Sequence, residues 1–258
     1  MNKLVSMRRG GELHGTLRAK LYDLVTPGVT PLDVEAEAMR LIQKLGAEPS
    51  FTRVPGYHWA TCINVNDSCV HGIPTSTTPF LSGDVVTVDV GLYYQGFHLD
   101  GAFTKQVGRA TKEGTQLVEG GNAALLATLE QVKPGNRVGY LASATEKALR
   151  AHGLSPFREL TGHGVGKELH EEPMLPNYLQ GDPVKTPQLV VGQTLAIEII
   201  CTLGKPALVL EDDGWTIRTR DGKLSGVFEE TVEVTSDGYS ILTTPALSQV
   251  NKSGKMQA

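Results

Sequence analysis

Cysteines, long apolar runs and an excess of either charge are all scarce in this sequence, and each scarcity excludes a class of protein. The three cysteines among 258 residues include no C-x-x-C pair and cannot all pair within the chain, which favours a reducing, cytoplasmic location. No apolar run approaches the length of a membrane span, and the N-terminal stretch MNKLVSMRRGGELHG lacks the apolar core of a secretory signal. The net charge of −4 gives no indication of general nucleic-acid binding. We therefore expect an ordinary soluble globular protein, with 40% hydrophobic and 20% charged residues.

Two helices are predicted near the N-terminus. Apolar residues recur at helical spacing from about Lys3 to Leu24. The stretch Thr30-Pro31-Leu32-Asp33 then has the features of a helix start, with a threonine cap, proline in the first turn and an acid near the positive end of the helix dipole. We expect that second helix to run to about Leu45, where Gly46 would end it.

The segment from Val85 to Phe103 is the clearest β-hairpin, with Gln95-Gly96 between two β-rich stretches. If these two residues form the turn, Asp89 and Asp100 lie on one face of the sheet as diagonal neighbours. Two carboxylates this close in an apolar segment repel each other unless a cation or a proton lies between them. The hairpin therefore predicts either a metal site or a pair of acids that share a proton.

The second part of the chain repeats the pattern of the first. A Pro-Gly pair, a helix, a glycine and then a strand with an acid occur twice in the same order. Val132–Gly135 and Gly153 follow Val25–Gly28 and Gly46 by 107 residues. Gly192 and Glu198 follow Gly83 and Asp89 by 109 residues. This divergent duplication predicts one domain over residues 1–258, with halves at about 1–110 and 111–245 and a short C-terminal tail. Two such halves would bring one acid each to the centre.

Further candidate site residues lie in the second half. Glu198 stands in the middle of a β-rich run, where a carboxylate without a partner is unfavourable. Glu229 belongs to a strand predicted over about 224–234. The simpler alternative to a functional role is that this is an edge strand and Glu229 faces solvent. The stretch TGHGVGKELHEEP carries His163 and His170, and its glycines let the backbone approach a ligand closely. Neutral imidazole is a common metal ligand and a ready proton donor, so we favour a functional role for this stretch.

Asp89, Asp100, His163, Glu198 and Glu229 together form a donor set of one imidazole and four carboxylates. Such a set suits two hard or borderline divalent cations, which bridging acids can hold about 3.5–4 Å apart. The pattern resembles type I methionine aminopeptidase, a peptidase of the pita-bread fold, over nearly the whole chain. The stretches that carry the resemblance are CVHGIP, VDV with GFHLD, TGHGVGKELHEEP, AIE, DGWTIRTRDGKLSG and FEETV.

The resemblance implies an α+β pita-bread fold with two pseudo-symmetric halves around a central antiparallel sheet. It also implies metal-dependent removal of the N-terminal methionine from nascent proteins and peptides. Nascent polypeptide N-termini would be the partners, association with the ribosome is left open, and no membrane or general nucleic-acid binding is expected.

The resemblance also implies how the five donors share two divalent ions, which could be cobalt, manganese, iron or zinc. Asp89 would bind one ion, whereas Asp100 and Glu229 would bridge both. His163 and Glu198 would complete the other site. Backbone oxygens of Asn66, Ser68 and Ser225 match a monovalent-cation site for sodium or potassium, on a weaker likeness.

Catalytic and substrate-binding roles follow from the same resemblance. Glu198 would accept the proton of the attacking water, His170 would stabilise the developing oxyanion, and His71 would contact the scissile amide nitrogen or assist proton transfer. An apolar pocket for the methionine side chain would be formed by Tyr57, Cys62 and Trp215. For these three, spacing alone favours ordinary core packing.

Several positions depart from the common family pattern. Gly91 and Ala196 stand where threonines are common, and Glu230 stands where histidine is frequent. Proline is usual at the position of Ile199, and aromatic residues are frequent at two pocket positions, Val54 and Leu169. These departures bear on metal affinity, rate and side-chain selectivity more than on hydrolysis itself.

Two alternatives remain open. A proline-directed peptidase of the same fold usually carries an additional N-terminal domain, for which this chain is too short. A noncatalytic pita-bread scaffold that binds protein or nucleic acid tends to lose metal ligands, and here all five are present.

Overall fold

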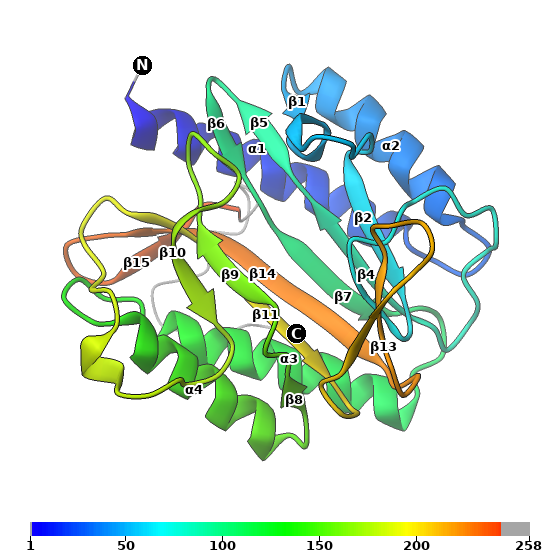
Figure 1. Cartoon of the computed structure of the whole chain (residues 1–258). Coiled ribbons are helices and arrows are strands. Elements are labelled where there is room, and N and C mark those ends of the chain that lie inside the picture. Colours follow the sequence, from blue (N-terminus) through cyan, green and yellow to red (C-terminus); the bar gives the residue numbers. More distant parts are fainter. Residues whose placement is uncertain (1, 244–258) are drawn as a thin grey trace.

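The computed structural model describes residues 2–243, and these residues form four long helices and a set of antiparallel strands (Figure 1). The helices are α1 (Lys3–Leu24), α2 (Pro31–Lys44), α3 (Lys112–Leu129) and α4 (Val138–Ala151). The strands are β1 (Glu48–Pro49), β2 (Thr61–Val65), β3 (Ser68–Val70), β4 (Val85–Val90), β5 (Leu92–Tyr94), β6 (Phe97–Leu99), β7 (Ala102–Gln106), β8 (Ser155–Pro156), β9 (Thr161–Gly164), β10 (Glu171–Pro176), β11 (Thr194–Thr202), β12 (Leu208–Leu210), β13 (Ile217–Thr219), β14 (Ser225–Val234) and β15 (Tyr239–Ile241). The predicted C-terminal tail lies outside the described residues. None of the helices within residues 2–243 has the length and apolarity that a membrane crossing needs.

The two N-terminal helices occur where the sequence predicts them. At the start of α2 the Thr30 hydroxyl accepts the Asp33 N–H at 3.1 Å, and the Asp33 carboxylate accepts the Thr30 N–H at 2.9 Å. This capping box satisfies two of the backbone donors that the first turn leaves free. The helix ends at Lys44, and Gly46 follows with a φ of +68°, a conformation that glycine adopts without steric cost.

The predicted hairpin is confirmed with the register expected from a turn at Gln95-Gly96. Tyr94 pairs with Phe97, and Asp89 pairs with Ala102. The ladder is interrupted between these two pairs, so that β5 and β6 form one short sheet with β1 while β4 and β7 form another with β2. The interruption frees the backbone around Asp100 from the strand pairing.

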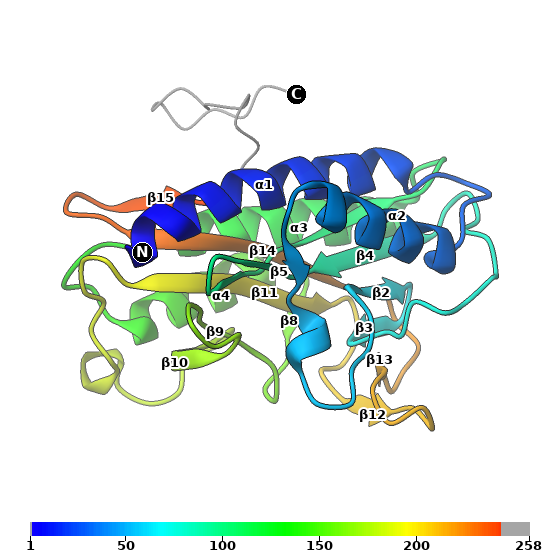
Figure 2. The same ribbon diagram turned by 90° about the horizontal axis from the view of Figure 1, so that it is seen from above.

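Two sheets meet at the centre of the molecule. One has the strand order β2-β4-β7, and the other has the order β10-β9-β11-β14-β15 with β8 beside β11. Strands β7 and β14 lie side by side where the sheets meet (Figure 1). Helices α1 and α3 lie on one side of these central strands, whereas β9, β10 and β12 lie on the other (Figure 2).

Threonine hydroxyls join β7 to β14. The Thr104 hydroxyl donates to the Val227 carbonyl at 2.7 Å and accepts the Val227 N–H at 3.0 Å. The Thr231 hydroxyl does the same for the backbone of Asp100, at 2.8 and 3.1 Å. Each hydroxyl therefore takes the place of a backbone partner, because it can donate and accept at once.

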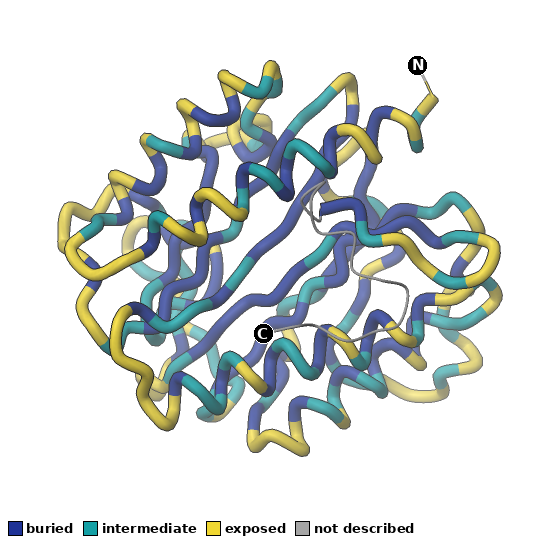
Figure 3. The backbone as a smooth tube through the Cα atoms, turned by 180° about the vertical axis from the view of Figure 1, so that it is seen from behind, coloured by how far each residue is buried: buried dark blue, intermediate teal, exposed yellow. Residues whose placement is uncertain are grey.

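Each half of the chain has its own apolar core. One cluster packs α1 and α2 against β2 and β4, with Leu17, Leu21 and Val88 fully buried. Another packs α3 and α4 against β11 and β14, with Leu117 and Leu149 fully buried. Figure 3 shows the consequence, since the central strands are mostly buried while the helices alternate buried and exposed residues.

The internal repeat extends to backbone conformation. Helices α2 and α4 both span 14 residues and begin 107 residues apart, and β4 and β11 begin 109 apart. The paired glycines share a positive φ: Gly28 and Gly135 (+94° and +84°), Gly46 and Gly153 (+68° and +70°), Gly83 and Gly192 (+106° and +83°). That all 258 residues act as one domain stays a prediction.

Candidate active site

Four strands bring three of the predicted acids into one row. Asp89 on β4 lies opposite Ala102 on β7, and Glu198 on β11 lies opposite Glu229 on β14. Because β7 and β14 are neighbours, Ala102 and Glu229 complete the row across the junction of the two sheets. The small side chain of Ala102 leaves space between Asp89 and Glu229. The solvent-facing alternative for Glu229 is wrong, because β14 is an inner strand and the residue is 2% exposed.

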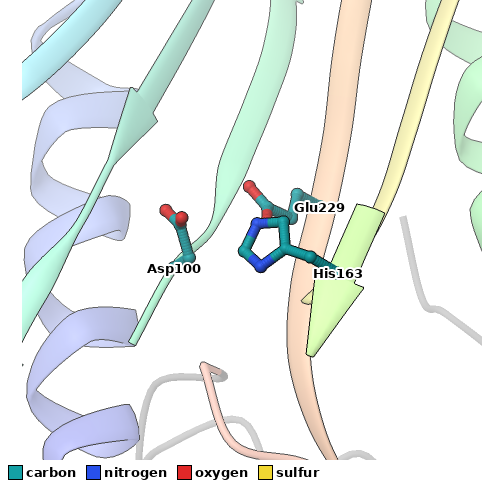
Figure 4. A group of neighbouring side chains, drawn as sticks. All are labelled: Asp100, His163 and Glu229. Atoms are coloured by element: carbon teal, nitrogen blue, oxygen red, sulfur yellow. The ribbon is translucent and has the colours of Figure 1, made fainter. Parts of the chain in front are cut away.

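Asp100, His163 and Glu229 form the densest group of donors. One ligand atom from each lies within 4.8 Å of the others, and all three residues are buried. Figure 4 shows the three side chains converging from the segment after β6, from β9 and from β14. The carboxyl groups of Asp89, Asp100 and Glu198 lie close enough to one another to shift each other's pKa. All five predicted metal ligands are therefore gathered in one place.

Burial governs the protonation of these acids in the protein without metal. It raises the pKa of Asp100 to about 7 and that of Glu198 to about 8, and the charge of Asp100 adds to the effect at Glu198. The pKa values of Asp89 and Glu229 are raised well above the usual range, first by burial and then by the neighbouring carboxylates. Acids in this state are held together at a cost, which a cation between them would remove.

His163 is prepared to act as a neutral ligand. Its Nδ1–H donates to the Gly164 carbonyl at 2.9 Å, so Nε2 carries the free lone pair. Burial, followed by the nearby ring of His170, lowers its pKa to about 4. Asp89 Oδ1 and Glu229 Oε1 are buried without a hydrogen-bond partner among the described residues. One neutral imidazole with several carboxylate oxygens, two of them unpartnered, fits divalent metal ions.

A cavity of about 330 Å³ opens beside the donors. Asp89, Asp100, His163 and Glu198 line one side of it, and apolar side chains line the other. The apolar side contains the three predicted pocket residues and the two pocket positions that depart from the family pattern: Tyr57, Cys62, Trp215, Val54 and Leu169. The space is thus acidic at one end and apolar at the other.

The two assisting histidines also line this cavity. The rings of His163 and His170 have centroids 4.4 Å apart at an angle of 71°. Burial lowers the pKa of both His170 and His71, so each is neutral at pH 7 and can donate one hydrogen bond. His71 has a φ of +58°, a strained conformation for a non-glycine residue, which turns the chain just after β3.

The aromatic residues of the apolar side contact one another. The rings of Tyr57 and Trp215 pack edge to face with centroids 5.1 Å apart. The Tyr57 hydroxyl donates to the Thr61 carbonyl at 2.8 Å and lies 3.2 Å from the Cys62 sulfur. These three residues are at once core residues and cavity walls.

The structure gives a reason for two of the departures. A side chain at Gly91 would meet the Phe51 ring, since a Cβ there would lie 2.5 Å from it. Glu230 forms an ion pair with Arg18 at 2.5 Å. Nothing in the structure explains Ile199.

The residues of the predicted monovalent-cation site also lie together. The Ser225 N–H donates to the Asn66 carbonyl at 3.0 Å, and the Ser225 hydroxyl donates to the Ser68 carbonyl at 3.1 Å.

Residues behind the donors were not found by sequence reasoning. His14 and Arg18 on α1 contact backbone carbonyls beside Asp89 and at Glu229. Their signal in the sequence is weak: a histidine and an arginine one turn apart in a helix that also carries Arg8, Arg9 and Lys20.

Comparison with known proteins is consistent with this geometry. Metallopeptidase family M24 matches residues 5–236. The methionine aminopeptidase of Clostridium perfringens is 36% identical, over 94% of this chain and 96% of that protein. Methionine aminopeptidase 1 of Bacillus subtilis is 36% identical, over 92% and 94% respectively.

Solved structures extend the likeness to the fold. The methionine aminopeptidase of Thermotoga maritima superposes with a TM-score of 0.90 at 37% identity, covering 94% of this chain and 96% of its own. The prolidase of Pyrococcus horikoshii shares the fold alone, with a TM-score of 0.75 at 23% identity, and the match covers 62% of its length. The two αβ halves around a central antiparallel sheet are the pita-bread fold. By its matched family model, its relatives and its fold, this chain belongs to metallopeptidase family M24.

Proposed function

We propose that this protein is a methionine aminopeptidase that uses two divalent cations to remove the N-terminal methionine from polypeptides. The observation that carries the proposal is the cluster of Asp100, His163 and Glu229, because Asp100 and His163 line a cavity that the apolar cluster around Tyr57 also lines. A substrate amine can then lie near the acids while its first side chain lies among Tyr57, Cys62 and Trp215. Nascent polypeptides in the cytoplasm, met at the ribosome, would be the natural substrates.

Five residues would hold the two ions. Asp89 would bind one, Asp100 and Glu229 would bridge both, and His163 and Glu198 would complete the other. When bound, two divalent cations lower the pKa of a water and polarise the scissile carbonyl. The hard oxygen donors and the single imidazole suit manganese, iron, cobalt and zinc alike. A sodium or potassium ion at the backbone oxygens of Asn66, Ser68 and Ser225 would tie the two halves together.

The remaining chemistry belongs to three side chains. Glu198, at the acidic end of the cavity, would accept the proton of the attacking water and pass it to the leaving amine. His170, neutral and beside His163, would donate a hydrogen bond to the oxyanion. His71 would contact the scissile amide nitrogen from across the cavity.

The apolar end favours methionine. Its unbranched thioether adapts to irregular spaces and contacts aromatic rings favourably, and Tyr57 and Trp215 offer such rings. Val54 and Leu169 leave more room than aromatic residues would, so leucine or norleucine at position one should be partly accepted. A misfit of one or two methylenes costs only about 1–3 kcal/mol, so this selectivity is expected to be modest.

The test compares four peptides of equal length that begin with Met-Ala, Leu-Ala, Ala-Pro and formyl-Met-Ala. The protein is stripped of metal and then assayed with each metal restored separately. Met-Ala should be cleaved fastest, and the formylated peptide should resist because its amine is blocked. Fastest cleavage of Ala-Pro would move the assignment to a proline-directed peptidase. Anomalous scattering from metal-soaked crystals should show two peaks among the five ligands, and no peak at saturating metal would remove the hydrolase proposal.

A further inference from the structure

Helix α1 contacts the candidate metal centre from the side opposite the substrate cavity. Arg18 lines a separate cavity of about 460 Å³ between α1 and α3, which shares no lining residue with the substrate cavity. Its guanidinium Nη1–H donates to the backbone carbonyl of Glu229 at 2.7 Å, and Nη2–H donates to the Glu230 carboxylate at 2.5 Å. The arginine side chain is 13% exposed and that of Glu230 is 17% exposed, so the pair is largely removed from water.

The carbonyl that Arg18 holds lies at the junction of the two halves. Thr231 bridges to Asp100 and Thr104 bridges to Val227, and Glu229 lies midway between these two bridges. Neither threonine reaches the Glu229 carbonyl, and Arg18 supplies its donor instead. Arg18 therefore fixes the backbone of a residue whose side chain is a proposed bridging ligand.

Neighbouring contacts show how closely α1 fits this place. His14, one turn before Arg18, is fully buried and donates from Nε2 to the Val90 carbonyl at 2.7 Å, directly after Asp89. Gly101, directly after Asp100, lies against both side chains: a Cβ there would be 2.8 Å from His14 Cε1 and 3.0 Å from Arg18 Nη1. One helix face thus touches the backbone at or beside Asp89, Asp100 and Glu229.

We propose that Arg18 is a positioning residue for the metal centre. Arg18 holds the Glu229 backbone in place through a charged hydrogen bond, and Glu230 anchors the guanidinium. The inference rests on the proposed function, because it takes Glu229 as a metal ligand. Groups that orient a ligand from behind typically change metal affinity by about 10–100-fold when they are lost. Arg18 touches no substrate, so its effect should appear in metal binding before it appears in the recognition of peptides.

The same helix and strand carry a matched control. Arg8 on α1 and Glu233 on β14 also form an ion pair, with two hydrogen bonds of 2.8 Å from Nε and Nη2. This second pair ties α1 to β14 as the first does, but it bonds no backbone atom of a proposed ligand. Arg8→Met therefore removes a second link between the same helix and strand, at a more exposed arginine, without removing a bond to Glu229.

The experiment titrates metal-free protein with Mn²⁺ by calorimetry and records the visible spectrum of the Co²⁺ form. Arg18→Met should weaken metal binding by about 10–100-fold and alter the cobalt spectrum, whereas Arg8→Met should leave both unchanged. Arg18→Lys keeps the charge and one donor and should recover part of the affinity. Glu230→Gln still offers an acceptor to Arg18 and should stay closest to the parent protein.

Three results would overturn the inference. A folded Arg18→Met protein with the parental dissociation constant and cobalt spectrum would exclude a positioning role, as would an equal loss in Arg8→Met. If Arg18→Met fails to fold, Arg18→Lys decides, and parental affinity in that variant excludes the role. A parent protein that binds no metal would instead overturn the proposed metal centre, so the two failures are distinguishable.

Discussion

The first and second halves of this molecule share a frame but contribute different chemistry. Helices α2 and α4 have the same length and begin 107 residues apart. Strands β4 and β11 carry Asp89 and Glu198 at equivalent positions. The match continues on β7 and β14, where Thr231 lies 127 residues after Thr104. The Thr104 hydroxyl bonds the backbone of Val227 on β14, and the Thr231 hydroxyl bonds the backbone of Asp100, just before β7. At that same offset, however, Glu229 corresponds to Ala102.

This difference shows what the repeat supplies and what it does not. The frame places one acid from each half at the centre, and it also places two threonines that hold the halves together. The other donors, Asp100 and His163, come from the interrupted hairpin of the first half and from β9 of the second.

The two assisting histidines, His71 from the first half and His170 from the second, provide the sharpest way to break the comparison. His170→Ala should lower turnover of a Met-Ala peptide by about 10²–10³-fold, as the loss of an oxyanion donor does, while metal binding persists. His71→Ala should lower it by about 10²-fold if it assists proton transfer. Steady-state kinetics and metal titration check both.

The control for these variants is His152→Ala, an exposed histidine at the end of α4 whose Nδ1 lies 2.9 Å from the Ala148 carbonyl. Its activity should equal that of the parent. Turnover near the parental value in His170→Ala would refute the proposed role, and loss of metal in that variant would make it a ligand instead.

The buried acids predict how the metal-free protein responds to pH. The folded pKa values of Asp100 and Glu198, about 7 and about 8, lie above their ordinary values of 3.8 and 4.5. A raised pKa stabilises the fold below the ordinary value, and that stability is lost as pH rises through the folded value. In chelator, stability and Tm should therefore both fall as the pH rises from about 4 to 8.

Thermal unfolding in chelator at pH 5 and pH 8 checks this expectation. Added Mn²⁺ should reverse the loss at pH 8, since a cation pairs with the ionised acids. Glu198→Gln removes one of the titrating groups and should show a smaller difference between the two pH values. A Tm that rises from pH 5 to pH 8 without metal would contradict the proposed protonation of the cluster.

Local patterns explain which parts of this comparison the sequence could predict. Helix α1 follows from apolar spacing, the start of α2 from Thr30 and Asp33, and the hairpin register from Gln95-Gly96, because each depends on neighbours in the chain. The family resemblance named the five donors, and their gathering at the meeting of two sheets agrees with it.

Long-range contacts explain what the sequence could not predict. Arg18 bonds Glu229, which is 211 residues away, and Thr231 bonds Asp100 across 131 residues. Nothing within a few residues of Arg18 or Thr104 distinguishes them from an ordinary helix or strand residue. Their roles depend on how β7 and β14 approach each other, which local spacing does not determine.

The two bridging threonines sharpen the comparison on a smaller scale. Thr104→Val and Thr231→Val keep the shape of the side chain but leave one buried N–H and one carbonyl without a partner. Each should cost about 1–3 kcal/mol in urea unfolding. Thr231→Val should also weaken metal binding, because Thr231 holds the backbone of Asp100, whereas Thr104→Val should not. Equal metal affinity in the two variants would mean that the junction acts on stability alone.

The smallest expected difference concerns the helix starts. Thr30 and Arg137 are equivalent N-cap positions of α2 and α4. The Thr30 side chain accepts a backbone N–H of its helix. The Arg137 side chain makes no cap hydrogen bond and donates instead to the Thr186 carbonyl at 2.6 Å. Thr30→Ala removes the two hydrogen bonds of the hydroxyl, one accepted from the Asp33 N–H and one donated to the Asp33 carboxylate. It should cost about 1 kcal/mol, the usual loss for an N-cap threonine. Thr30→Ser keeps a hydroxyl and should restore most of that stability. Arg137→Ala loses only a partly exposed hydrogen bond and should cost about 0.5 kcal/mol. Urea unfolding of metal-loaded protein measures all three, and a larger loss for Arg137→Ala than for Thr30→Ala would show that the second helix depends more on its contact with Thr186 than the first does on its cap.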